Sequence, residues 1–304
     1  MPQNSAVKKN AIVAKPFVKW AGGKGNLLKK LEALLPANFS DLKNVTYIEP
    51  FVGGGAMLFH ILNTHKNVKR IVINDINKDL IRCYQLVKEE PKTLIKLLHP
   101  LERRYYELNE DERKRYFYEI RDRYNNAQIS KDLRAAYLIF LNHTCFNGLY
   151  RENASGKFNV PFGRYKKANI CNEEIIEADH KVLKNVEIIC GDYKNILKYL
   201  SIKDNFIYFD PPYRPLPGSN NFNQYSKSGF SDPEQVELKH FCDYLSSKGC
   251  YIMLSNSDST NIDGTSYFER LYEGYNFNKI LAPRFINAYA DKRKKQQEMI
   301  IKNY

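Results

Sequence analysis

Residues 47–56 read Tyr-Ile-Glu-Pro-Phe-Val-Gly-Gly-Gly-Ala. An apolar run that ends in an acid is typical of a buried strand. The glycines that follow predict a turn whose missing side chains let a ligand approach the backbone. Residues 56–62 continue as an amphipathic helix. A strand, a glycine turn and a helix in this order indicate a doubly wound α/β fold.

Short apolar runs elsewhere in the chain extend this pattern. They lie at residues 45–48, 70–73, 186–190, 205–209 and 250–254, and each is bounded by an acid or by turn residues. Residues 233–246 have a helical pattern that precedes the last run. The alternation predicts an α/β fold with a doubly wound, mostly parallel sheet, in which ligands bind at the carboxyl ends of the strands.

One long segment, residues 84–171, interrupts the alternation. Residues 92–124 are charged, aromatic and helical in pattern, residues 133–141 form an apolar helix, and residues 142–167 are rich in Asn, Gly, aromatic and basic residues. We therefore predict a mainly helical inserted domain over 84–171 and a discontinuous domain over 15–83 and 172–304. Residues 1–14 are predicted to be a disordered tail.

Composition restricts the class of partner and the compartment. The chain has 304 residues, 43% of them apolar, and a formal charge of +13. This charge favours a polyanionic partner, although a solvated basic surface stays open. The six cysteines contain no Cys-x-x-Cys pair, which favours reduced thiols and no bound metal. No apolar run suits a signal peptide or a membrane span, so we expect a soluble, cytoplasmic protein.

Acidic residues at the ends of predicted strands suggest what the glycine turn binds. The turn lacks the spacing of dinucleotide sites and the Gly-Lys-Ser/Thr ending of phosphate loops, which disfavours a pyrophosphate. Asp75 is placed to accept hydrogen bonds from both ribose hydroxyls, and Asp192 could accept the amino group of an adenine ring. Each acid could instead cap a helix. Together they predict an adenosine pocket without phosphates.

The strand at 205–209 ends in Asp210-Pro211-Pro212-Tyr213. The exocyclic N6 of adenine is a poor nucleophile, because its lone pair is delocalised into the ring. Asp210 and the Pro211 carbonyl could accept its two hydrogens, the prolines would fix the direction of the carbonyl, and Tyr213 would stack on the base. A duplex adenine must leave the helix to reach such a site. The alternative is a Pro-Pro turn with a capping Asp.

A third motif, Phe-Val-Lys-Trp-Ala-Gly-Gly-Lys, occupies residues 17–24. With these motifs in this order, the chain resembles the Dam-like DNA adenine-N6 methyltransferases of the alpha group over about residues 15–304. The resemblance implies a Rossmann-like methyltransferase fold, double-stranded DNA as substrate and S-adenosylmethionine as cofactor. The residues that it assigns to cofactor binding are Trp20, Lys24, Glu49, Pro50, Phe51, Gly53, Gly55, Asp75, Asp192 and Tyr193.

Residues 146–153 and 156–165 predict a polar β-hairpin with Gly156 in its turn. Residues 147–167 contain five basic residues and one acid, a net charge of +4. This charge suits a DNA major groove; a lid packed on its own domain is the alternative.

In the family that the chain resembles, this hairpin recognises GATC. The resemblance makes Arg151 and Lys19 guanine contacts. It assigns further DNA contacts to Phe146, Asn147, Leu149, Asn153, Pro161 and Arg164, with Phe146 and Asn147 beside the gap left by the flipped adenine. Glu152, Ala154 and Ser155 depart from the family pattern, which weakens the prediction of GATC.

Two further segments bear on function. Residues 214–232, with Asn221, Phe222 and Tyr225, resemble the family's mobile loop over the active site. Residues 292–295 are a basic cluster, either a phosphate contact or a solvated face. Four alternative functions stay open: methylation of RNA adenine, methylation of cytosine N4, DNA binding without catalysis, and a nicotinamide oxidoreductase. We expect a monomer. The setting, a restriction-modification system or a solitary enzyme, is not determined by the sequence.

Overall fold

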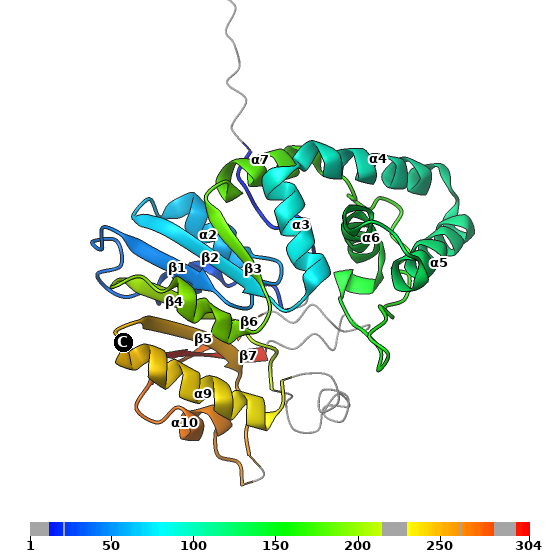
Figure 1. Cartoon of the computed structure of the whole chain (residues 1–304). Coiled ribbons are helices and arrows are strands. Elements are labelled where there is room, and N and C mark those ends of the chain that lie inside the picture. Colours follow the sequence, from blue (N-terminus) through cyan, green and yellow to red (C-terminus); the bar gives the residue numbers. More distant parts are fainter. Residues whose placement is uncertain (1–11, 21, 215–229, 262, 283–295) are drawn as a thin grey trace, which may run out of the picture.

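The strands form a single mixed sheet (Figure 1). The computed structural model describes residues 12–20, 22–214, 230–261, 263–282 and 296–304. Within these ranges, seven strands lie in the order β3-β2-β1-β4-β5-β7-β6. Five are parallel: β1 (Val45–Glu49), β2 (Val68–Asp75), β3 (Val186–Cys190), β4 (Asn205–Phe209) and β5 (Tyr251–Ser257). The predicted mostly parallel sheet is confirmed.

Two strands at the end of the sheet were not predicted. β7 (Gln296–Lys302) runs antiparallel to β5 on one side and to β6 (Asn276–Ala282) on the other. This antiparallel pair places Glu298 opposite Ser257, near the carboxyl end of β5.

Alternating side chains of the central strands build a core on each face of the sheet. Tyr47 and Phe206 belong to one buried cluster, which includes side chains of α1 (Leu28–Glu32), α2 (Ala56–Thr64), α3 (Lys78–Glu89) and α7 (Glu173–Leu183). Ile48 and Ile207 belong to the other, which includes side chains of η2 (Tyr193–Tyr199), α9 (Asp232–Ser247) and α10 (Tyr267–Leu271). Helical elements therefore cover both faces, as a doubly wound sheet requires.

Three helices lie beside the sheet: α4 (Pro91–Glu107), α5 (Glu110–Asn126) and α6 (Lys131–Thr144) (Figure 1). The predicted helical stretch 92–124 is two helices, because Leu108 is extended and Asn109 starts a new helix with a capping box to Glu112. The predicted boundary between residues 83 and 84 falls within α3, which packs against α4 and α6 as well as against β2 and β3. The division into two domains stays a prediction.

The segment predicted as a β-hairpin has a hairpin turn but no continuous strand ladder. Its pairing consists of two isolated antiparallel bridges, Cys145 with Phe162 and Glu152 with Phe158. Gly156 lies in the turn with φ +69°, a conformation that favours glycine. The segment begins with a short 3₁₀ helix, η1 (Phe146–Gly148). The arms are also held by α5, because the Asn125 side chain donates to the Phe158 carbonyl and accepts from the Phe158 amide, both at 2.9 Å.

All six cysteines are free, and five of them are buried. This agrees with the expected reduced thiols. No helix among the described residues is long and apolar enough to cross a membrane.

Candidate active site

Four acids that the sequence singled out lie along one edge of the sheet. β1 to β4 are mutually parallel, so their carboxyl ends share an edge. β1 ends at Glu49 and β2 at Asp75, whereas Asp192 and Asp210 follow closely after β3 and β4. The order of the strands thus brings together residues that are far apart in the sequence.

The glycine turn after β1 is fixed to β2 and to the amino-terminal segment. The Gly53 amide donates to Asp75 Oδ2 at 3.0 Å. A Cβ on Gly53 or Gly54 would lie 2.8 or 2.9 Å from atoms of Trp20. These two glycines therefore make room for an indole ring of the chain itself. Burial raises the pKa of Asp75, although hydrogen bonds from backbone amides, Asn77 and Gly53 among them, oppose the shift.

Two pairs of stacked aromatic rings involve residues in or next to this turn. Trp20 stacks on Tyr150, with ring centroids 5.3 Å apart and planes at 15°, so the predicted cofactor residue also contacts the inserted segment. Tyr193 stacks on Phe51 at 5.3 Å. Asp192 accepts a hydrogen bond from the Lys194 amide through Oδ1 at 2.8 Å and so caps η2, one of the two interpretations that the sequence left open.

Glu49 is the most buried acid of this edge, with 2% of its surface exposed. Its Oε2 accepts a hydrogen bond from the Tyr47 hydroxyl at 2.7 Å. Burial and the nearby charge of Asp210 raise the pKa of Glu49 well above its ordinary value.

Asp210 is paired with a buried lysine from the amino-terminal motif. Lys24 Nζ lies 2.9 Å from Asp210 Oδ1, and the Lys24 side chain is 3% exposed. The same ammonium donates to the Gly22 carbonyl at 2.6 Å and lies 4.7 Å from the centre of the Tyr213 ring. A buried lysine needs such partners, because an unpaired charge in this position would be costly. The motif at 17–24 and the tetrapeptide at 210–213 therefore form one site.

Glu298 completes this cluster from β7. Its Oε2 accepts a hydrogen bond from the Tyr213 hydroxyl at 2.8 Å and lies 3.9 Å from Lys24 Nζ. Desolvation raises the pKa of Asp210 to about 6; the charge of Lys24 opposes the shift, and the charge of Glu298 adds to it. Asp210 is consequently an acceptor that ionises close to neutral pH.

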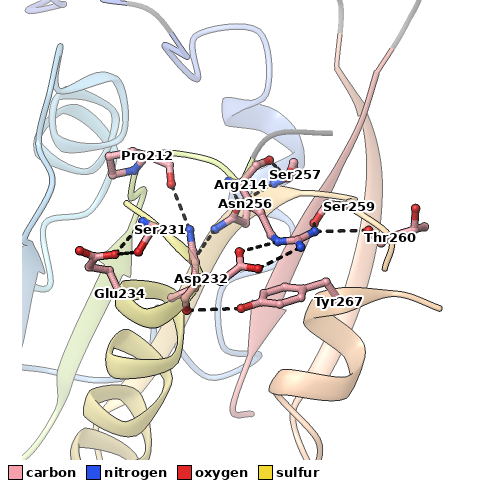
Figure 2. Close-up of polar contacts among 11 residues, drawn as sticks. Pro212, Arg214, Ser231, Asp232, Glu234, Asn256, Ser257, Ser259, Thr260 and Tyr267 are labelled. Atoms are coloured by element: carbon pink, nitrogen blue, oxygen red, sulfur yellow. Dashed lines mark hydrogen bonds and ion pairs between the residues drawn. The ribbon is translucent and has the colours of Figure 1, made fainter. Parts of the chain in front are cut away.

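The backbone after Asp210 is held by buried amides of α9 and β5, on both sides of Tyr213 (Figure 2). Gln235 Nε2 donates to the Pro212 carbonyl at 3.2 Å, and the Arg214 amide donates to Asn256 Oδ1 at 3.0 Å. Asn256 Nδ2 in turn donates to Gln235 Oε1 at 3.2 Å. Both amide side chains have no exposed surface. This chain of hydrogen bonds fixes the path of the tetrapeptide.

Arg214 anchors the same segment at the surface (Figure 2). Its guanidinium pairs with Asp232 at 2.7 and 3.1 Å and lies 4.0 Å from the centre of the Tyr267 ring. The hydroxyl of Ser257 donates to the Arg214 carbonyl at 2.6 Å. The start of α9 and the end of β5 are thereby tied to the residue after Tyr213.

On the insert side, Lys19 lies against the segment 146–165. The Lys19 amide donates to Asn142 Oδ1 at 2.7 Å, and Asn142 Nδ2 donates to the Gly148 carbonyl at 3.0 Å. A Cβ on Gly148 would lie 2.4 Å from Lys19 Cβ, so only glycine fits at this close approach. Lys19 Nζ lies 4.6 Å from the centre of the Tyr165 ring. The structure thus brings Lys19 to the segment that contains the other predicted DNA contacts.

The remaining predicted DNA residues differ in how they are held. Arg151 is exposed, and its Nε donates to Asn159 Oδ1 at 2.7 Å. Asn153 Oδ1 accepts from the amides of Ser155 and Lys157, both at 3.0 Å, so Asn153 has a structural role in the turn. Phe146, Asn147, Pro161 and Arg164 are exposed, and Leu149 is half-buried. Arg164 lines a hollow with Arg113, Phe162, Tyr165, Lys166 and Lys167.

Sequence reasoning missed three residues of the site: Gln235, Asn256 and Glu298. Each has polar neighbours in the sequence: Gln235 follows Glu234, Asn256 lies between two serines, and Glu298 follows two glutamines. No local pattern therefore marked them. Some predictions lie outside the described residues: Ala21 of the amino-terminal motif, the loop residues Asn221, Phe222 and Tyr225, and the basic cluster 292–295.

Comparison with known proteins identifies the family of the chain. A family model described as D12 class N6 adenine-specific DNA methyltransferase matches residues 20–284. The type II methyltransferase M.MjaIII of Methanocaldococcus jannaschii is 44% identical, over 95% of this chain and 99% of the relative. M1.LlaDCHI of Lactococcus lactis, also a type II methyltransferase, is 38% identical over 98% of both chains. A DNA adenine methylase of Vibrio cholerae is 33% identical over 93% of this chain and 94% of the relative.

The chain belongs to the family of D12 class N6 adenine-specific DNA methyltransferases. It is an enzyme of mixed α/β fold that methylates adenine N6 in DNA. Membership of this family argues against the four alternatives: an RNA substrate, cytosine N4, DNA binding without catalysis, and nicotinamide chemistry.

Proposed function

We propose that this enzyme transfers a methyl group from S-adenosylmethionine to an adenine flipped out of duplex DNA, within the sequence GATC. The observation that carries the proposal is the contact between Asp210 and the buried Lys24, 2.9 Å apart. It joins the amino-terminal motif to the tetrapeptide at the strand edge where ligands bind in doubly wound folds.

The side chains along this edge suit a nucleoside cofactor without phosphates. Asp75 is half-buried and Asp192 is exposed. The Phe51 and Tyr193 rings stack on each other and pack in the same apolar cluster as Phe209 of β4. Acids accept hydroxyl and amino hydrogens, and they repel phosphate. S-adenosylmethionine would supply an electrophilic methyl group. Trp20, Lys24, Glu49, Pro50, Gly53 and Gly55 are proposed as further cofactor contacts.

Asp210 and the Pro211 carbonyl would accept hydrogen bonds from the two N–H groups of the adenine N6 amine. These hydrogen bonds would steer the lone pair of the nitrogen out of the ring plane. The ring of Pro212 would restrict rotation of this backbone, and Tyr213 would stack on the base. Gln235 and Asn256 would keep the tetrapeptide in position while the base enters. The ionised form of Asp210 is the accepting form, so the reaction would require a pH above its pKa.

The proposal of GATC rests on the resemblance of the segment 146–165 to the family's recognition hairpin. The exposure of Arg151 and the closeness of Lys19 to the segment support it. Arg151 would read guanine in the major groove, and Phe146 and Asn147 would fill the gap left by the flipped base. This proposal includes two further points. The inserted domain 84–171 would recognise the target sequence, and the enzyme would act as a monomer that methylates each strand in a separate encounter.

The test is to incubate purified enzyme with unmethylated plasmid DNA and S-adenosylmethionine, and to map modified bases by single-molecule sequencing. We expect N6-methyladenine confined to GATC, and none with Asp210→Ala. N6-methyladenine at another sequence would refute the proposed specificity alone. Methylation by Asp210→Ala would refute the proposed chemistry.

A further inference from the structure

Three potential metal ligands meet on the side of the protein away from the methylation site. Glu32 is the last residue of α1, His60 lies in α2, and His65 follows α2. His60 Nε2 lies 2.6 Å from Glu32 Oε2, and His65 Nε2 lies 3.0 Å from Glu32 Oε1. One ligand atom from each residue can be chosen so that all three lie within 4.8 Å of one another.

We propose that Glu32, His60 and His65 bind a transition-metal dication of the Zn²⁺ class. Imidazole nitrogens and one carboxylate are a ligand set that such ions prefer, and three protein ligands leave one position for water. In a tetrahedral zinc site, ligand atoms lie about 3.4 Å apart. The observed separations are hydrogen-bond lengths. To admit the ion, Glu32 would therefore move apart from His60 by about 0.8 Å and from His65 by about 0.4 Å.

The side chains of the cluster already point at one another. Both imidazoles direct Nε2 toward the Glu32 carboxylate, at 2.6 Å from His60 and 3.1 Å from His65. The ion would replace the protons that now hold the three side chains together.

The surroundings hold the ligands in place and leave a path to solvent. The His65 ring packs edge-on against Phe39, with centroids 5.0 Å apart. The His65 amide donates to the Ile61 carbonyl at 3.0 Å, and its own carbonyl accepts from the Val68 amide at 3.3 Å. The Glu32 side chain is 37% exposed. An ion can reach the cluster, and the rotation of His65 is restricted.

The position of the cluster assigns it a structural role. Val68 is the first residue of β2, so His65 lies at the amino end of that strand, opposite the edge that carries Asp75. α2 follows the glycine turn, and α1 begins shortly after Lys24. A bound ion would tie these two helices together and stabilise the part of the fold that leads into the methylation site.

This inference departs from the sequence-based expectation of no metal, which relied on the cysteines. His60 and His65 are five positions apart, and Glu32 lies in a separate helix. The separation of the two histidines and the distance of Glu32 from them in the sequence match no common zinc motif. The three residues converge only through the packing of α1 on α2.

The test is to titrate ZnCl₂ into the full-length enzyme after removal of metals with a chelator, and to measure heat of binding and melting temperature. We expect one equivalent of Zn²⁺ to bind and the melting temperature to rise. His60→Ala and His65→Ala should each weaken binding at least tenfold. His99→Ala is the matched control, because His99 contacts a single acid, Glu173, at 3.4 Å.

Co²⁺ provides a second readout that does not depend on stability. Visible absorption typical of tetrahedral Co²⁺ should develop with one equivalent of CoCl₂ in the unaltered enzyme, and should be lost in Glu32→Gln. Absence of stoichiometric Zn²⁺ binding would overturn the proposal. So would binding that survives in both histidine variants, since the ion would then lie elsewhere.

Discussion

The pH dependence of methyl transfer should follow the ionisation of Asp210. Its pKa is raised from 3.8 to about 6 by burial. About nine-tenths of the free enzyme would carry the carboxylate at pH 7, and about one-tenth at pH 5. In the proposed mechanism only the ionised Asp210 carboxylate accepts the hydrogen bond from the amine. The value of kcat/KM should therefore fall about tenfold for each pH unit below 6.

Changing a charged neighbour of Asp210 should shift the pH dependence in a known direction. Glu298 raises the pKa of Asp210, so Glu298→Gln should move the acid limb of the profile to lower pH. Glu187→Gln is the matched control, since Glu187 pairs with Arg70 at the surface. The assay is transfer of a tritiated methyl group to duplex DNA under single-turnover conditions at constant ionic strength. An acid limb near pH 4, or an upward shift with Glu298→Gln, would refute the reasoning.

The same shift has a consequence for stability. A folded pKa above the unfolded pKa means that the favourable contribution of Asp210 is present below pH 3.8 and is lost as the pH rises through about 6. A shift of about two units corresponds to about 3 kcal/mol. Between pH 4 and pH 7, the free energy of unfolding of the unaltered enzyme should therefore fall by up to this amount more than that of Asp210→Asn. Urea unfolding of both proteins at the two pH values measures the difference, and a parallel pH dependence would contradict it.

Three further predictions concern positioning and DNA binding. Asn256→Ala should lower kcat with little change in DNA affinity. It should also destabilise the fold by about 1–3 kcal/mol, because the Arg214 amide and Gln235 lose a buried partner. Unchanged kcat in a stably folded variant would contradict this prediction. Arg151→Ala should lose about 1–3 kcal/mol of discrimination at one guanine, measured by competition between oligonucleotides; uniform weakening would instead indicate a phosphate contact. DNA affinity should fall steeply with salt in fluorescence titrations, since the charge is +13, and a flat response would contradict a phosphate-binding surface.

Much of the central fold could be predicted because it depends on local patterns. Apolar runs bounded by acids or turn residues marked β1 to β5, and their spacing marked a parallel sheet, since buried parallel strands need continuous apolar residues. β6 and β7 were missed. β7 reads Gln-Gln-Glu-Met-Ile-Ile-Lys, and its amino-terminal half shows no strand alternation. It became recognisable only through its pairing with β5 and β6.

The motifs by themselves predicted methylation of adenine N6, which the family comparison confirms; the glycine turn, the acids at strand ends and the tetrapeptide 210–213 were recognised without tertiary information. Only the tertiary structure brought Lys24 to Asp210, Glu298 to Tyr213, and the buried amides of Gln235 and Asn256 to the backbone between them. The convergence of Glu32 with two histidines was likewise decided by helix packing. Sequence patterns record periodicity and local conformation, whereas these contacts join residues from separate elements whose distance depends on the packed core.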